Sequence, residues 1–118
     1  MIGEVIVAMP NEDTYSLALR DNVSHTSTTV DCRRDSGKKT VWVESTLDKV
    51  IPCQIQISRD GANWFNYNAA FNIQFGNVTR RMEYRTISDM FFFIRVQFQA
   101  AVAPTVGTIY IYVQRRAF

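Results

Sequence analysis

The sequence predicts an all-β protein, an antiparallel β-sandwich or jelly roll of about eight strands. Apolar and polar residues alternate with a period of two along most of the 118 residues, as expected for half-buried strands. The apolar positions are rich in Val, Ile, Phe and Tyr, which favour strands over helices. Turn signals recur at intervals of about 8 to 12 residues, a spacing typical of antiparallel sandwiches and barrels.

Strand character begins within residues 12–20. A helix is the alternative there, but apolar residues recur at every second position, which favours a strand. Residues 26–30 include several β-branched side chains and predict another strand. Because the first part of the chain is otherwise polar, we expect a single domain over residues 1–118 in which residues 1–25 form an extended arm.

Four longer runs supply most of the predicted core. Successive side chains of a strand point to opposite faces, so each run places one series of residues inward and the other outward. The mainly apolar series are Val41, Val43 and Ser45; Cys53, Ile55 and Ile57; Phe92, Ile94, Val96 and Phe98; and Ile109, Ile111 and Val113. In the first run Trp42 opposes Val41 and Val43, and one of these two sets points away from the core.

Turn signals lie between these runs. Residues 35–39 contain Asp, Ser and Gly and predict a turn before the first long run, and residues 47–49 separate the first run from the second. Residues 103–107 contain Pro and Gly and predict a hairpin between the last two strands.

Residues 58–64, Ser-Arg-Asp-Gly-Ala-Asn-Trp, predict a tight turn at the end of a strand. Asp60 and Gly61 make the turn, because glycine readily adopts a positive φ. Asn63 is expected to hydrogen-bond the local backbone. Trp64 is expected to fold back as a large apolar plug. This motif is therefore assigned a structural role.

No catalytic chemistry is indicated by the sequence. His25 is the one histidine, and the chain contains no P-loop, GxGxxG, HExxH or GxSxG motif. Cys32 and Cys53 lack the spacing of a zinc site, and their apolar surroundings predict buried free thiols, with a disulfide as the alternative. We therefore predict a protein that is not an enzyme and requires no cofactor or metal.

Charge and hydropathy narrow the possible partners. The chain has 13 Lys and Arg against 11 Asp and Glu, and a net charge of +2 does not by itself indicate nucleic acid. Basic pairs such as Arg33-Arg34 lie mostly near turns, where charges solvate a surface, so nucleic acid is an unlikely partner. No apolar run approaches the roughly 20 residues that cross a bilayer, so no membrane association is expected.

Several aromatic side chains are predicted to point away from the core. If the Ile109 series faces inward, the tyrosines that alternate with it face outward. Outward aromatics favour a protein interface, while a sugar-stacking platform and burial on both faces of a strand are the alternatives. Arg95 lies on an apolar strand and requires an ion pair or an intersubunit contact. The candidate contact residues are Trp42, Phe93, Arg95, Tyr110, Tyr112, Arg115, Arg116 and Phe118.

Five segments within residues 26–114 carry a resemblance to known proteins. They are Thr-Ser-Thr-Thr-Val-Asp-Cys at 26–32, Lys-Thr-Val-Trp-Val-Glu-Ser-Thr-Leu-Asp at 39–48, Gln-Ile-Gln-Ile-Ser-Arg-Asp-Gly-Ala-Asn-Trp at 54–64, Phe-Ile-Arg-Val at 93–96 and Gly-Thr-Ile-Tyr-Ile-Tyr at 107–112. In this order they resemble small β-sandwich virion proteins of tailed bacteriophages, of the capsid decoration or cement type, and related bacterial proteins of unassigned function.

The resemblance implies a non-enzymatic structural protein that stabilises a capsid through protein–protein contacts. Its expected partners are the major capsid protein or other virion proteins, and copies of itself in a homo-oligomer. Its expected location is the virion, after assembly in the host cytoplasm. The resemblance supplies no catalytic residue. Because similar strand motifs occur in sugar-binding sandwiches, the alternative function is a carbohydrate-binding module of a tail or cell-surface protein.

Overall fold

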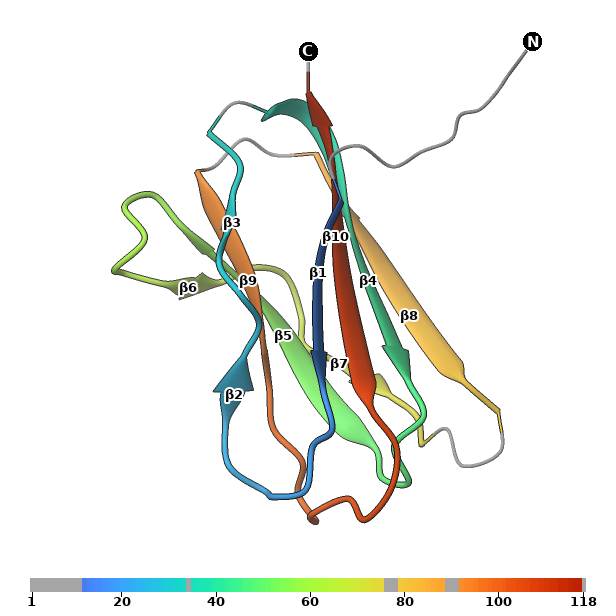
Figure 1. Ribbon diagram of the computed structural model, residues 1–118. Helices are drawn as coiled ribbons and strands as arrows, with labels where there is room; N and C mark the ends of the chain where they lie inside the picture. The colour runs from blue at the N-terminus through green and yellow to red at the C-terminus, as the bar shows by residue number, and fades with distance from the viewer. Residues whose placement is uncertain (1–11, 34, 76–78, 89–91, 118) are drawn as a thin grey trace, which may run out of the picture.

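The structure is a computed structural model that describes residues 12–33, 35–75, 79–88 and 92–117. Its strands form two antiparallel sheets packed face to face (Figure 1), which confirms the predicted sandwich. Within these residues the strands number ten rather than about eight: β1 (Glu12–Leu17), β2 (His25–Thr26), β3 (Val30–Asp31), β4 (Asp35–Ser45), β5 (Ile51–Ser58), β6 (Phe65–Asn66), β7 (Phe71–Ile73), β8 (Arg81–Ile87), β9 (Phe93–Phe98) and β10 (Ile109–Ala117). Within the described ranges, no helix is long and apolar enough to cross a membrane.

The strand order explains the higher count. Sheet 1 has the order β1-β10-β4-β8, and sheet 2 has the order β2-β9-β5-β6. In sheet 2, β3 also pairs with β9 and β7 also pairs with β5. Two positions of that sheet are therefore each occupied by two short strands. The ten strands fill eight positions, the number found in a jelly roll.

The predicted hairpin at residues 103–107 is wrong. β9 pairs with β5 in sheet 2, whereas β10 pairs with β1 and β4 in sheet 1, so this segment crosses between the sheets. Its end is fixed by a reciprocal pair of hydrogen bonds: Thr46 N donates to Thr108 O (3.0 Å), and Thr108 N donates to Thr46 Oγ1 (2.9 Å). Alternation could not reveal the crossing, because both strands direct their apolar residues into the same core.

Two boundaries differ from the sequence prediction. Residues 35–39, predicted as a turn, begin β4, because β10 continues past a bulge and pairs Ala117 with Asp35. The strand expected over residues 26–30 is interrupted and appears as β2 and β3. The strand prediction within residues 12–20 is confirmed by β1. Of the predicted arm, residues 1–11 lie outside the described residues.

The core lies between the two sheets and includes most of the predicted apolar series, together with buried residues from other segments such as Leu47 and Ile73. Val41 and Val43 of β4 are fully buried, as are Ile94, Val96 and Phe98 of β9. The Phe98 ring lies 6.2 Å from that of Tyr15 in β1, so an aromatic contact joins the two sheets.

Two residues at strand ends break the alternation. Phe92 is 46% exposed, because β9 begins only at Phe93. Ile57 is half-buried, and its neighbour Ser58 is the buried residue at the end of β5.

Both cysteines are free thiols buried in the core, as predicted. Burial raises the pKa of the Cys53 thiol to about 12. Because the thiolate is the reactive form, neither cysteine is expected to react with a disulfide reagent such as DTNB in the folded protein at pH 8. Both are expected to react at once in guanidinium chloride. Rapid labelling of the native protein would contradict this packing.

Asp48 holds two loops together at the lower end of the sandwich. Its carboxylate accepts hydrogen bonds from the Thr105 backbone N–H (2.9 Å) and from the Thr105 hydroxyl (2.6 Å), which joins the β4–β5 loop to the β9–β10 loop. These bonds lower the pKa of Asp48 below its usual value of 3.8. The carboxylate's contribution to stability is thus present above about pH 4 and is lost as the pH falls toward the folded-state pKa.

We expect Asp48→Asn to lower the thermal midpoint at pH 5, because the ionised acceptor is gone. The difference in thermal midpoint between the variant and the parent should shrink as the pH falls from 5 to 2. Over this range the parent progressively loses the stabilisation that its Asp48 carboxylate contributes. Calorimetry at a series of pH values measures both quantities. An offset that stays constant across this range would show that the loop contact does not depend on the charge.

Candidate interaction surfaces

The predicted contact residues lie on two opposite faces and at one end of the sandwich. Trp42, Tyr110 and Tyr112 project from the outer face of sheet 1, while Phe93 and Arg95 project from the outer face of sheet 2. Arg115 lies at the end of β10. The side chain of Arg116 and all of Phe118 lie outside the described residues. The predicted set therefore does not form one surface.

Sheet 1 carries a continuous group of aromatic rings, which we call the sheet-1 patch: Trp42, Tyr84, Tyr110 and Tyr112. Trp42 of β4 stacks on its cross-strand partner Tyr84 of β8, with ring centroids 5.8 Å apart and planes inclined by 20°. The guanidinium of Arg80 lies over the Tyr110 ring at 4.5 Å. The rings come from three neighbouring strands, so β-sheet register positions them.

Polar groups hold the sheet-1 patch in place. Glu44 accepts hydrogen bonds from Trp42 Nε1 (2.7 Å) and from Arg80 Nη1 (2.8 Å), which fixes the indole and the guanidinium together. Burial, and then the charge of Glu44, raise the pKa of the Tyr112 phenol. Beside these groups is a shallow hollow of about 310 Å³ lined by Glu12, Trp42, Glu44, Tyr112 and Gln114.

β8 also contributes to this surface, which its sequence did not predict. Tyr84 is 54% exposed and Met82 is 42% exposed, and both project from the same face as Trp42. A period-two signal was present, because Met82, Tyr84 and Thr86 alternate with Glu83, Arg85 and Ile87. Ile87 is the one buried residue of β8. The alternation in β8 therefore lacks the series of apolar residues that indicated the longer strands.

On sheet 2, Arg95 is compensated within the chain. Its guanidinium lies 4.1 Å from the centre of the Trp64 ring, and its Nε donates to Gln56 Oε1 at 2.8 Å. Among the described residues, these contacts take the place of the ion pair predicted for Arg95, and its intersubunit contact stays a prediction. Trp64 is only half-buried and covers Arg95 on the outer face, so it does not plug the core as expected. Phe93 in turn lies beneath the Arg33 guanidinium at 5.2 Å.

The turn after β5 is organised by Asp60. Its Oδ1 accepts hydrogen bonds from the backbone N–H groups of Ala62 and Asn63, both at 2.9 Å. Gly61 has φ 80°, the conformation that glycine tolerates. The Asn63 side chain donates to Asp60 Oδ2 (2.8 Å) instead of bonding to the backbone as predicted. These bonds lower the pKa of Asp60, so the turn is built around an ionised carboxylate.

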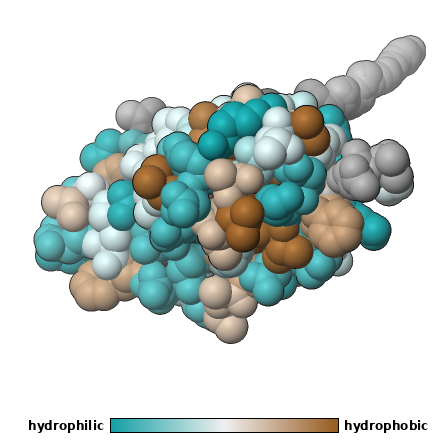
Figure 2. All heavy atoms as spheres, turned by 90° about the horizontal axis from the view of Figure 1, so that it is seen from below, coloured by the Kyte–Doolittle hydropathy of each residue, from teal (hydrophilic) through white to brown (hydrophobic). Residues whose placement is uncertain are grey.

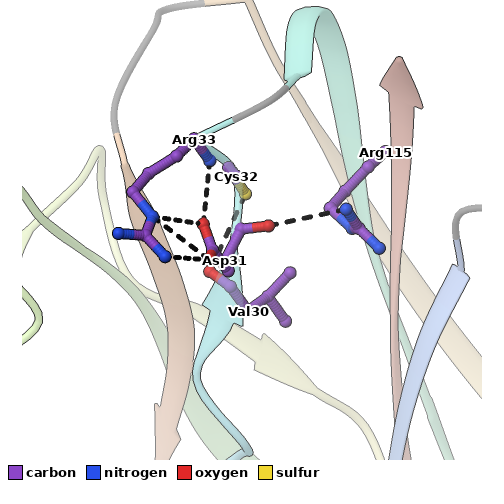
Figure 3. A network of polar contacts seen from close by, with 5 residues as sticks. All are labelled: Val30, Asp31, Cys32, Arg33 and Arg115. Atoms are coloured by element: carbon purple, nitrogen blue, oxygen red, sulfur yellow. Dashed lines mark hydrogen bonds and ion pairs between the residues drawn. The ribbon is translucent and has the colours of Figure 1, made fainter.

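Arg115 connects the two sheets near the end where residue 117 lies. Its Nε donates to Asp13 Oδ2 of β1 at 2.7 Å, and its Nη1 donates to the carbonyl oxygen of Asp31 in β3 at 3.5 Å. Figure 3 shows Asp31 between Arg115 and Arg33. The guanidinium of Arg33, at 2.6 Å, holds the pKa of Asp31 at about 2. Arg115 thus makes internal structural contacts.

The lower end of the sandwich presents scattered apolar side chains. Val102 and Val106, in the β9–β10 connection, are 60% and 53% exposed. Figure 2 looks at this end and shows brown side chains near its centre, with teal ones around and between them. Single exposed valines are ordinary on protein surfaces and indicate no partner by themselves. Within the described ranges, no cluster of three or more His, Cys, Asp or Glu could hold a metal ion.

Comparison with known protein families finds no match, and comparison with curated proteins finds none either. Solved structures do share the fold. The PBSX exported protein XepA superimposes with a TM-score of 0.72 at 13% identity over 97% of this chain, which spans only 40% of XepA. A carbohydrate-binding module, CBM4, gives 0.51 at 16% identity, with 89% of this chain and 71% of the module covered. The SPBc2 prophage-derived protein YomS gives 0.50 at 10% identity, with 96% of this chain and 99% of YomS covered. At these identities the likeness establishes a shared β-sandwich fold.

Proposed function

We propose that this chain is a non-enzymatic structural protein of a tailed-phage particle and that it decorates the capsid through the sheet-1 patch. The patch is the observation that carries the proposal. It presents a stacked Trp42–Tyr84 pair, two further tyrosines and Arg80 on one face. Trp, Tyr and Arg are the residues most enriched among those that dominate protein–protein binding energy.

The pre-ordered state of these side chains favours binding. Trp42 and Arg80 are both held by Glu44, so little side-chain freedom remains to be lost when a partner covers them. Two proteins with the same fold, XepA and YomS, come from prophages, which supports a phage origin for this chain. On a capsid, such a surface would stabilise the assembled shell, because a ligand that binds only the assembled state shifts the equilibrium toward it.

The test is cosedimentation of the purified protein with isolated heads of the phage that encodes it. We expect saturable, stoichiometric binding. Tyr84→Ala should weaken it by at least about tenfold, as expected for a residue that dominates an interface. The matched control is Phe65→Ala, which removes a similarly exposed aromatic ring (65%) from sheet 2 and should leave binding unchanged. Absence of head binding, or equal effects of the two variants, would contradict decoration through this patch.

The proposal includes self-association on the shell, as a homo-oligomer. Light scattering after size exclusion, over a wide range of concentration, gives the mass in solution. A stable oligomer that dissociates in Tyr84→Ala would assign the patch to contacts between copies. A monomer of 13.6 kDa at every concentration would restrict the patch to the capsid protein itself.

A further inference from the structure

The outer face of sheet 2 contains a second hollow, about 350 Å³ in volume, on the side opposite the sheet-1 patch. This volume is within the range of small-molecule sites. Its lining combines small apolar side chains with three amides: Pro52, Cys53, Gln54, Ala70, Gln97, Gln99, Ala100 and Ala101. Gln54 of β5 and Gln97 of β9 are cross-strand partners, and Gln99 follows two residues later on the same face. We call this site the amide hollow.

Backbone carbonyls orient two of the three amides, those of Gln54 and Gln99. Gln54 Nε2 donates to the backbone carbonyls of Ile55, Tyr67 and Asn68 at 2.9–3.2 Å. Gln99 Nε2 donates to the carbonyl of Asn22 at 3.0 Å. Since a carbonyl only accepts hydrogen bonds, these contacts require the NH₂ group at that position and determine which way each amide faces.

The Gln97 amide is anchored to the Ser24 hydroxyl, with Nε2 and Oγ 2.9 Å apart. Because a hydroxyl both donates and accepts, this contact holds the amide in place without determining its direction. No donor within the described part of the chain bonds to the Oε1 atoms of Gln54, Gln97 or Gln99. The amide hollow is thus lined by two oriented amides, those of Gln54 and Gln99, and by the anchored amide of Gln97, and no described protein group donates to their oxygens.

We propose that the amide hollow is a binding site for a neutral glycan. Three acceptors in one small site suit a ligand with several hydroxyl donors. The neighbouring surfaces of Pro52, Ala70 and Ala101 suit the apolar C–H face of a sugar ring. None of the described lining residues is charged, which disfavours an ionic ligand. The Arg95–Trp64 pair lies two residues further along β9 on the same face, about 7 Å away, where a longer chain would reach it.

This site is separate from the sheet-1 patch, so its function does not depend on capsid decoration. A protein bound through sheet 1 would leave sheet 2 facing away from the shell. In that position the amide hollow could contact glycans of a cell surface.

The experiment is a titration of the ¹⁵N-labelled protein with a panel of neutral hexasaccharides built from glucose, mannose, galactose or N-acetylglucosamine. Hexagalacturonate serves as the acidic comparison. We expect at least one neutral oligosaccharide to shift the side-chain amide signals of Gln54, Gln97 and Gln99. The acidic oligosaccharide should bind no better than the neutral ones. The Trp42 indole signal, on the opposite face, should remain in place.

Methionine variants separate the acceptor from the bulk of the side chain. Gln97→Met and Gln99→Met keep the length of the side chain and remove the amide, its oxygen and its NH₂ group together, and each should weaken binding by about tenfold. Gln56→Met is the matched control on the same face. The Gln56 amide oxygen already accepts from Arg95, and its NH₂ group already donates to Asn66. The affinity of this variant for the glycan should therefore change less than about twofold.

Thermal midpoints of the variants distinguish lost binding from lost folding. No shift of the glutamine amides with any neutral hexasaccharide up to about 10 mM would overturn the proposal. So would shifts confined to the sheet-1 patch, tighter binding of hexagalacturonate, or equal losses in Gln56→Met and Gln97→Met. Binding to phage heads is measured in a separate experiment. A protein that binds no glycan could still decorate heads, and a protein that does not bind heads could still bind a glycan.

Discussion

Gly107→Ala is expected to lower the free energy of unfolding by about 3 kcal/mol or more. Gly107 has φ 96°, a conformation that costs an L-residue about 1–2 kcal/mol. An added Cβ would also lie 2.1 Å from the Thr46 carbonyl oxygen and 2.7 Å from the Leu47 nitrogen. These are backbone atoms, which cannot turn aside as a side chain can, and crowding of this kind costs about 1–3 kcal/mol more.

Gly61→Ala is the matched control for this prediction. Gly61 also has a positive φ, 80°, but its added Cβ would meet only the Phe93 side chain, at 3.7 Å. We therefore expect a loss of about 1–2 kcal/mol, from the conformation alone. Urea unfolding of the three proteins gives both values. A Gly107→Ala variant that is no less stable than Gly61→Ala would show that the crossing segment does not pack closely against Thr46.

Phe98→Ala is expected to cost about 3–5 kcal/mol, the range for removing a buried phenylalanine ring. Phe98 is fully buried and contacts rings from two strands: Tyr15 at 6.2 Å and His25, stacked, at 5.7 Å. The first contact joins the sheets and the second fixes β2 on β9. The cavity left by the missing ring would weaken both contacts. The urea concentration at the midpoint of unfolding should therefore fall.

Two controls separate burial from loss of aromatic character. Phe65→Ala removes the same atoms from a site that is 65% exposed and should change stability by no more than about 0.5 kcal/mol. Phe98→Leu keeps much of the volume and should cost less than about 2 kcal/mol. If Phe98→Ala were as mild as Phe65→Ala, the core between the sheets would not be packed as described.

Much of the fold was predictable from alternation alone. The period-two pattern correctly indicated the inward faces of the long strands, because burial of one face imposes that pattern directly. It could not assign strands to sheets. β9 and β10 look alike in sequence, since each offers an apolar face to the same core, yet they belong to different sheets. Pairing depends on contacts between distant segments, which one-dimensional periodicity does not contain.

The candidate surfaces were harder to predict for the same reason. Trp42, Tyr110 and Tyr112 were expected to face outward, and the structure places them on one sheet. Tyr84, which stacks on Trp42, lies 42 positions from it in the sequence and becomes its neighbour only through strand register. The unused acceptors of the amide hollow were also beyond prediction, because they depend on which backbone carbonyls each amide meets.

The position of β10 has a consequence for the order of events during synthesis. β10 lies between β1 and β4 at the centre of sheet 1, although it is translated after both of them. Until residues 109–117 emerge, β1 and β4 have no partner between them, and their edges are open to pairing with other chains. Sheet 1 must therefore assemble after translation of this segment, through contacts of high sequence separation that form slowly. Nascent and truncated chains are the forms most exposed to aggregation.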